Sequence, residues 1–167
     1  TIQNIFDAVK GTDRKVVVMG KYLQTIIEMA IREGYLDVPN GMIFGSGCLL
    51  DTSRFVRTIA DYLNLSTGVI NGYLVGEHGE HQVPVWSKVT VGGIAIDEYC
   101  EETSIKWNDN IKNEITLNTR KMGSEIIKAK GRTHYGIATT VCYIADAIIN
   151  QRPTIASVTS PLMGEHG

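Results

Sequence analysis

The chain has 167 residues, of which 43% are hydrophobic and 20% charged, a composition typical of a globular protein with a buried core. Its 16 basic and 18 acidic residues give a net charge of −2, so there is no electrostatic reason to expect a nucleic acid or an anionic membrane as partner. The longest apolar runs are too short to span a bilayer, and residues 1–15 do not resemble a signal peptide.

The cysteine and histidine patterns argue against disulfides and metal. Cys48, Cys100 and Cys142 are odd in number, widely spaced and set in apolar surroundings, which predicts buried free thiols in a reducing compartment, by default the cytoplasm. His78 and His81 stand three residues apart in a glycine-containing segment, with no third group of ligands nearby. We therefore expect no metal site.

The first quarter of the chain alternates helical and strand patterns. Apolar residues recur at helical spacing over residues 2–10 and again over residues 23–31, where the helix is expected to end near residue 34. Short apolar runs over residues 15–19 and 42–44 predict buried strands. This order is βαβ-like and implies a parallel sheet whose first strands are absent from the chain.

The rest of the chain predicts a mixed fold. Asp51 or Thr52 is a plausible N-cap for a helix over residues 52–63, and Gly92-Gly93 is expected to be the turn of a hairpin. The other expected elements are strands over residues 68–75, 83–91 and 154–159, and helices over 108–128 and 134–150 that are separated at Lys130-Gly131.

Three residues form a candidate catalytic set. His78 follows a strand pattern and can change protonation near neutral pH, Asp51 can orient it, and Arg54 can grip a carboxylate with two parallel hydrogen bonds. The structural alternatives are that His78 is a polar loop residue without a catalytic role and that residues 51 and 54 form a surface ion pair. By spacing alone, these structural interpretations are favoured.

The segment Gly45-Ser46-Gly47 invites a dinucleotide-binding interpretation because it lies between a predicted strand and a predicted helix. The third glycine of that motif is replaced by Leu50, and no acidic residue follows in the right setting. A tight turn at the edge of the sheet explains the segment better.

Taken together, three ordered segments resemble the L-lactate/malate dehydrogenase family, and its lactate branch most closely. The resemblance covers about residues 42–167, and its spacing and order make it specific. The segments are Gly45-Ser46-Gly47-Cys48-Leu49-Leu50-Asp51-Thr52-Ser53-Arg54-Phe55, then Gly76-Glu77-His78-Gly79 with Val83-Pro84-Val85-Trp86-Ser87, and Lys130-Gly131-Arg132-Thr133-His134-Tyr135-Gly136-Ile137-Ala138.

The resemblance assigns roles to the candidate set. It implies that His78 is the general acid/base, donating a proton to the 2-keto oxygen of the substrate while the nicotinamide delivers hydride. Asp51 would stabilise the imidazolium, and Arg54 would bind the substrate carboxylate. The cofactor would carry the redox chemistry, and the protein would supply position and charge.

The resemblance also implies residues that contact substrate and cofactor. Thr133 matches the position that lines the substrate side chain, and a threonine there is similar to the lactate branch. Ser46, Leu50 and Ile137 match positions near the nicotinamide ring of NAD. The implied partners are a small 2-keto or 2-hydroxy acid and further copies of the chain, as a tetramer or dimer.

The chain also departs from the family pattern. The glycine loop of the nucleotide-binding half and the mobile loop with a second arginine are missing, and Lys21-Tyr22-Leu23 stands where the family has Asn-Pro-Val. Glu80-His81 replaces the usual residues after Gly79. Val56 and Asn71 occupy the positions where an arginine and a histidine bind fructose 1,6-bisphosphate in regulated bacterial enzymes, so this regulation is not expected.

The sequence therefore predicts an α/β (α+β) chain that resembles the C-terminal half of a lactate dehydrogenase. Residues 1–44 are expected to be the last βα portion of a Rossmann domain, and residues 45–167 a catalytic domain truncated at its C-terminus. We expect an NAD-dependent L-lactate dehydrogenase-like protein whose 167 residues alone are inactive. The alternative is a non-catalytic, dehydrogenase-like module for binding or assembly, which the Lys21-Tyr22-Leu23 replacement favours.

Overall fold

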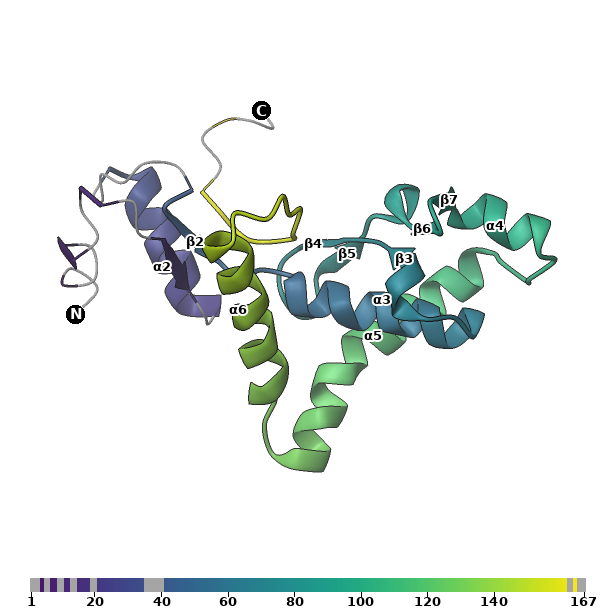
Figure 1. Cartoon of the computed structure of the whole chain (residues 1–167). Helices are drawn as coiled ribbons and strands as arrows, with labels where there is room; N and C mark the ends of the chain where they lie inside the picture. Colours follow the sequence, from purple (N-terminus) through teal and green to yellow (C-terminus); the bar gives the residue numbers. More distant parts are fainter. Residues whose placement is uncertain are drawn as a thin grey trace. The chain divides into compact units, whose positions relative to one another are not determined.

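The computed structural model describes residues 15–18, 21–34 and 41–161, with the isolated residues 4, 7, 8, 11, 12 and 164; for residues 21–24 it describes the backbone alone. The chain divides into two compact units, and Figure 1 labels most of the elements of both. Unit 1 comprises residues 1–46 and 158–167, and unit 2 comprises residues 47–157. Most of the helix expected over residues 2–10 lies outside the described residues.

Unit 1 contains a parallel βαβ arrangement. Strand β1 (Val16–Val18) pairs in parallel with β2 (Ile43–Gly45), and helix α2 (Lys21–Arg32) lies between them in the chain. The two strands and the helix expected in this part of the sequence are confirmed, with small shifts at their ends. The buried side chains at the centre of this unit are Val18, Ile27 and Ile43.

The strand expected over residues 154–159 is wrong for all but its last residue. Thr159 forms an isolated antiparallel bridge to Gly45, with backbone N···O distances of 2.7 and 3.1 Å. Ile155 in the same segment is 81% exposed. A β-branched composition favours a strand only where a partner strand can pair with it, and residues 154–158 pair with no strand that the structure describes.

Unit 2 begins with helix α3 (Leu49–Leu63), which starts three residues before the expected position. The N-cap is Cys48, so the prediction of Asp51 or Thr52 is wrong. Both residues lie inside the first turn, where their side chains are buried and make hydrogen bonds to residues outside the helix, Asp51 to His78 and Thr52 to Leu74. The side chains of Asp51 and Thr52, which sequence preference suggests as helix caps, therefore make tertiary hydrogen bonds instead.

Two expected strands are broken into shorter pieces. The segment over residues 68–75 forms a 3₁₀ turn and two short strands, and the segment over 83–91 is interrupted by another 3₁₀ turn. The hairpin at Gly92-Gly93 is confirmed, although Ile96 begins a helix that was not predicted. The elements are β3 (Ile70–Asn71), β4 (Leu74–Gly76), β5 (Gln82–Pro84), β6 (Thr90–Val91), β7 (Ile94–Ala95), and helix α4 (Ile96–Glu102).

These strands form two small antiparallel sheets. One has the order β3-β6-β7, and the other is the β4-β5 pair, in which Val75 lies opposite Val83. The β4-β5 connection, residues 77–81, carries His78. The sheet topology therefore places the candidate histidine at the end of a two-stranded hairpin.

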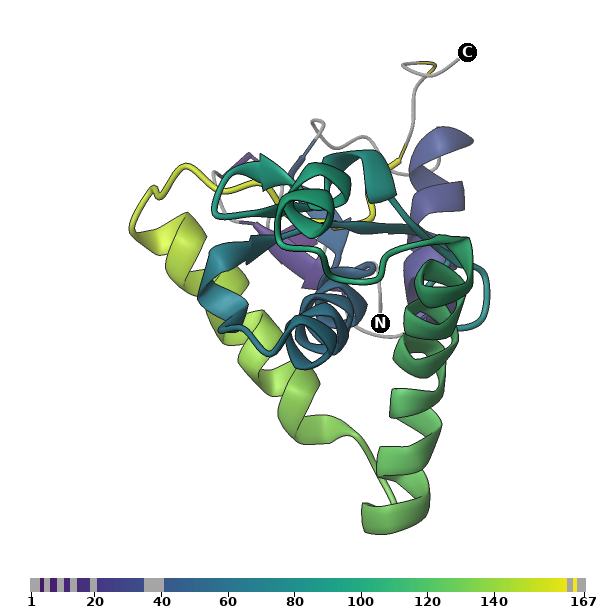
Figure 2. The same ribbon diagram turned by 90° about the vertical axis from the view of Figure 1, so that its right-hand side faces the viewer.

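Two long helices complete unit 2, as predicted. Helix α5 (Asp109–Lys130) begins after Asn108, whose side chain accepts a hydrogen bond from the N–H of Ile111, and it ends at Gly131 in a left-handed conformation. Helix α6 (His134–Ile149) follows. Figure 2 shows α5 and α6 diverging from this turn, and α3 packs against both.

The main core of unit 2 lies between α3 and the small sheets. Phe55 and Ile59 of α3 are fully buried there, and Trp86 packs edge-on against Phe55 with ring centroids 4.9 Å apart. The mixed α/β class predicted from the sequence is confirmed. Among the described residues, no helix has both the length and the apolar character needed to cross a membrane.

Candidate active site

The site is organised around the carboxylate of Asp51. This side chain lies in the first turn of α3 and is 3% exposed. A buried carboxylate requires charged or hydrogen-bonding partners, and the N-terminal end of a helix also favours negative charge. Asp51 has two such partners, one on each carboxylate oxygen.

The first partner is Arg54, one helical turn further on. Its Nη1 atom donates to Oδ1 of Asp51 at 3.0 Å, and the Arg54 side chain is only 11% exposed. The spacing of three residues places both side chains on the same face of α3. An arginine has five N–H donors, so the Asp51 bond uses one of them.

The second partner is His78, from the loop after β4. Its Nδ1 atom is hydrogen-bonded to Oδ2 of Asp51, and its side chain is 49% exposed, in contrast to the buried carboxylate. When the imidazole is neutral, this contact favours the tautomer with the proton on Nδ1, which makes Nε2 the accepting nitrogen. The arrangement thus suits proton transfer between Nε2 and a bound molecule.

The loop that carries His78 is shaped by glycine. Gly76 and Gly79 have φ values of 90° and 121°, which side-chain-bearing residues rarely adopt. Across the loop, Nδ1 of His81 is hydrogen-bonded to Oε2 of Glu77 at 2.9 Å. In the described part of the chain, no three Cys, His, Asp or Glu side chains gather in a way that could hold a metal ion.

The nearby cysteine is not a nucleophile. Burial and, to a smaller extent, the negative charge of Asp51 raise the pKa of the Cys48 thiol to about 11. The thiolate is the reactive form of cysteine, so at neutral pH Cys48 is an inert, protonated side chain. Its thiol donates to the carbonyl oxygen of Gly76 at 3.3 Å.

The other four predicted site residues are Thr133, Ile137, Leu50 and Ser46. Thr133 and Ile137, at the start of α6, line a shallow cavity with Arg132 and His134. Leu50 instead lines a cavity of about 500 Å³ between α3 and α6. Ser46 belongs to unit 1, where it is buried and its N–H donates to the carbonyl oxygen of Val18 at 3.2 Å. The structure brings together His78, Asp51 and Arg54, and it brings Thr133 and Ile137 to one cavity while Leu50 lines another.

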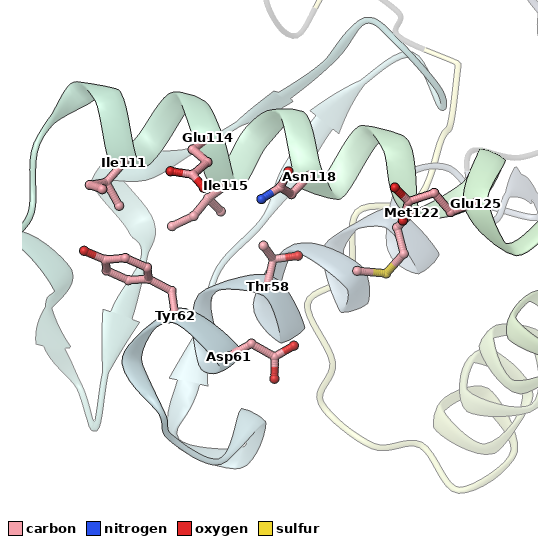
Figure 3. Close-up of a pocket in the computed structure, with 9 residues that line it drawn as sticks. All are labelled: Thr58, Asp61, Tyr62, Ile111, Glu114, Ile115, Asn118, Met122 and Glu125. Carbon is pink, nitrogen blue, oxygen red and sulfur yellow. The ribbon is translucent and has the colours of Figure 1, made fainter.

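A third cavity, between α3 and α5, has the wrong charge for an anionic ligand. Its volume is about 360 Å³, and Figure 3 shows apolar side chains and several carboxylates facing it. Like charges repel, so a carboxylic acid substrate is disfavoured there. Its lining residues are Thr58, Asp61, Tyr62, Ile111, Glu114, Ile115, Asn118, Met122 and Glu125.

Sequence reasoning missed a glycine that lies beside Arg54. Gly123 lies inside α5, and a Cβ atom there would stand 3.4 Å from Nη1 of Arg54, at van der Waals contact. The guanidinium therefore lies close to the backbone of α5. The available signal was an isolated glycine inside a long helical pattern, which often has a packing reason.

Comparison with known proteins identifies similar sequences. The family profile described as "lactate/malate dehydrogenase, alpha/beta C-terminal domain" matches residues 48–167. The L-lactate dehydrogenase of Chloroherpeton thalassium is 34% identical over 131 residues, which cover 78% of this chain and 43% of that protein. The L-lactate dehydrogenase of Staphylococcus epidermidis is 39% identical over 131 residues, which cover 78% of this chain and 40% of that protein. The chain thus matches less than half the length of these relatives.

Solved structures show the same likeness. The minor L-lactate dehydrogenase from Enterococcus mundtii, in a ligand-bound form, superposes with a TM-score of 0.84 at 31% identity, over 99% of this chain and 52% of that one. A lactate dehydrogenase from a deep-sea metagenome library superposes with a TM-score of 0.82 at 25% identity, over 95% of this chain and 50% of that one.

Proposed function

Given that the chain belongs to the lactate/malate dehydrogenase family, we propose that it handles the substrate in an NAD-dependent L-2-hydroxyacid dehydrogenase of the lactate type. The observation that carries the proposal is the buried carboxylate of Asp51, which engages His78 and Arg54 through different oxygens. The proposed substrate pair is pyruvate and L-lactate, and the relatives named L-lactate dehydrogenase support it.

Arg54 is proposed to bind the substrate carboxylate. A guanidinium presents paired N–H donors whose geometry matches a carboxylate, which the point charge of lysine cannot reproduce. Because Arg54 is nearly buried, a carboxylate that reaches it would lose much of its water. Electrostatic attraction is stronger where water is excluded. The Asp51 contact fixes one end of the guanidinium and so sets the orientation of the rest.

His78 is proposed to transfer the proton. In the reductive direction the imidazolium would give the proton on Nε2 to the keto oxygen of the substrate, and in the oxidative direction neutral Nε2 would take it back. Asp51 would stabilise the imidazolium and hold the ring in place through Nδ1. The half-exposed position of the ring is compatible with both tasks because its partner is buried while the ring itself can be reached.

NAD is the proposed cofactor, and when bound it supplies the hydride. Leu50 and Ile137 are half-buried apolar side chains of a kind that suits one face of a nicotinamide ring, and Ser46 could add a polar contact. The apolar character of Leu50 and Ile137 supports the proposal. Their arrangement adds no support, because the two residues line different cavities. Thr133 is proposed to contact the side chain of the substrate.

The domain assignment is likewise a proposal. The parallel βαβ arrangement of unit 1 supports residues 1–44 as part of a nucleotide-binding domain, and residues 45–167 are proposed as the catalytic domain. Homo-oligomerisation and a cytoplasmic location are proposed as well. Analytical ultracentrifugation tests the first, and the free, buried thiols of Cys48 and Cys100 support the second.

Titration of the chain with pyruvate tests the function. We expect saturable binding, detected by calorimetry or by NMR shifts, and at least about tenfold weaker binding for Arg54→Lys, because a charge-assisted hydrogen bond contributes about 1.5–3 kcal/mol. Arg57→Lys is the matched control, since Arg57 lies on the same helix in an exposed ion pair with Asp61.

Two outcomes would contradict the proposal. Absence of saturable pyruvate binding would favour the alternative, a non-catalytic binding or assembly module. Equal weakening by Arg54→Lys and Arg57→Lys would show that binding follows net charge and does not use the proposed site.

A further inference from the structure

One edge of strand β4 is covered by side chains where a third strand would otherwise pair. On the edge that faces β5, the backbone carbonyl oxygen of Tyr73 accepts a hydrogen bond from the N–H of Val85 at 3.0 Å. Backbone groups alternate between the two edges of an antiparallel strand, so those of Leu74 and Gly76 point to the other edge. In the part of the chain that the structure describes, β4 pairs with β5 alone.

Two side chains at the start of α3 make hydrogen bonds to backbone groups on that other edge. The N–H of Leu74 donates to Oγ1 of Thr52 at 3.0 Å, and the carbonyl oxygen of Gly76 accepts from the thiol of Cys48 at 3.3 Å. Cys48 and Thr52 are both buried. Cys48 occupies the N-cap position but makes no side-chain capping bond, so its thiol acts across the unit and not on its own helix.

The spacing of the two contacts matches helix to strand. Residues 48 and 52 are one turn apart, which is about 6 Å along a helix, and residues 74 and 76 are about 7 Å apart along a strand. Cys48 meets the last residue of β4 and Thr52 meets the first. The strand therefore runs antiparallel to the start of the helix and is held at both ends.

Asp51 lies between these two contacts on the helix, and His78 lies two residues beyond the strand. We propose that Cys48 and Thr52 are positioning residues that fasten β4 to the first turn of α3 and thereby hold His78 against Asp51. This inference rests on the proposed function for its catalytic meaning. The geometry itself can be measured without substrate or cofactor.

The test is NMR of the whole chain labelled with ¹⁵N. The signature is the Nδ1 proton of His78, which a strong bond to a carboxylate shifts far downfield and protects from exchange. We expect Thr52→Val and Cys48→Ala each to shift this resonance upfield or to remove it by exchange with water. Thr52→Ser, which keeps the hydroxyl, should restore it.

Thr119→Val is the matched control, because Thr119 is also a buried threonine in a helix and its hydroxyl bonds within α5 and to Thr58. It should leave the His78 resonance unchanged. If Thr52→Val does not fold, Cys48→Ala still tests the proposal, since it removes only a sulfur atom.

The proposal is overturned if the folded Cys48→Ala and Thr52→Val chains keep the wild-type His78 resonance. It is also overturned if Thr52→Ser loses the resonance as fully as Thr52→Val does. A failure of pyruvate binding with an intact, Thr52-dependent resonance would refute the proposed function and leave the positioning role standing.

Discussion

Arg54 donates to Asp51 across a single helical turn at 3.0 Å, and both side chains are almost completely buried, at 11% and 3% exposure. The same helix carries a second pair, Arg57 with Asp61 at 2.9 Å, whose side chains are 64% and 58% exposed. The two pairs are similar in chemistry and in distance. Because the two pairs differ chiefly in burial, comparing them shows how burial changes the contribution of an ion pair to stability.

Removing the buried carboxylate should destabilise the chain far more than removing the exposed one. Asp51→Asn leaves the buried Arg54 without its counter-charge, which typically costs about 3–5 kcal/mol. Asp61→Asn breaks an exposed pair worth at most about 1 kcal/mol. Urea unfolding followed by tryptophan fluorescence measures both. Equal losses for the two variants would refute the view that Asp51 anchors the site.

The three cysteines should differ sharply in reactivity. Burial raises the pKa of Cys100 as well as that of Cys48, and the charge of Asp97 adds to the shift at Cys100. Cys142 is exposed on α6, so the prediction of a buried thiol is wrong for this residue. A pH of about 8 is about three units below the Cys48 pKa of about 11, so about one Cys48 thiol in a thousand is ionised. A thiol reagent should therefore modify one site quickly in the native chain and all three after denaturation.

Cys142→Ser is the control for this experiment. It should abolish the fast phase and leave the two slow sites as they were. A fast phase that survives in this variant would mean that Cys48 or Cys100 is reached without unfolding.

A pH-dependent contribution to stability should come from Asp97. Its Oδ1 atom accepts from Nζ of Lys112 at 2.7 Å and from Nε1 of Trp107 at 2.9 Å. The Lys112 hydrogen bond holds the pKa of Asp97 below its ordinary value of 3.8, with burial opposing and Trp107 assisting. Because the pKa of Asp97 is lower in the folded state, the ionised carboxylate stabilises the fold at pH values above the unfolded-state pKa. This stabilisation is lost as the pH falls through the folded-state pKa.

Asp97→Asn should therefore lower the free energy of unfolding at about pH 7 and have less effect at about pH 3. Urea titrations at the two pH values give the comparison, and Lys112→Met should reproduce the loss at neutral pH. An effect of Asp97→Asn that is the same at both pH values would contradict the assignment.

The two glycines that flank His78 should respond differently to alanine. Both have positive φ, so each substitution should cost roughly 1 kcal/mol in backbone strain. At Gly76 a Cβ atom would also stand 3.1 Å from the carbonyl oxygen of His81, whereas at Gly79 no atom lies within 4 Å. Thermal unfolding should show a larger loss for Gly76→Ala than for Gly79→Ala. The reverse order would mean that the loop relaxes freely around residue 76.

Local patterns predicted the helical part of unit 2 well. The periodicity over residues 108–128 and 134–150 corresponds to α5 and α6, and Gly131 ends the first helix in a left-handed conformation that glycine adopts without strain. The strands over residues 68–75 and 83–91 were predicted as continuous and are not. Short strands depend on neighbours far away in the sequence, which a local pattern does not contain.

For the candidate site, the sequence by itself determined that Asp51 and Arg54 share one face of a helix, because the α-helical repeat brings residues three apart together. It also predicted His78 as the candidate for proton exchange near neutral pH. Only the tertiary structure decided that these groups meet. The hairpin of β4 and β5 returns along the first turn of α3, and the side chains of Cys48 and Thr52 hold the strand there. Because Asp51 is buried, its carboxylate is satisfied by two partners within the protein, Arg54 and His78, since a charge removed from water needs such partners.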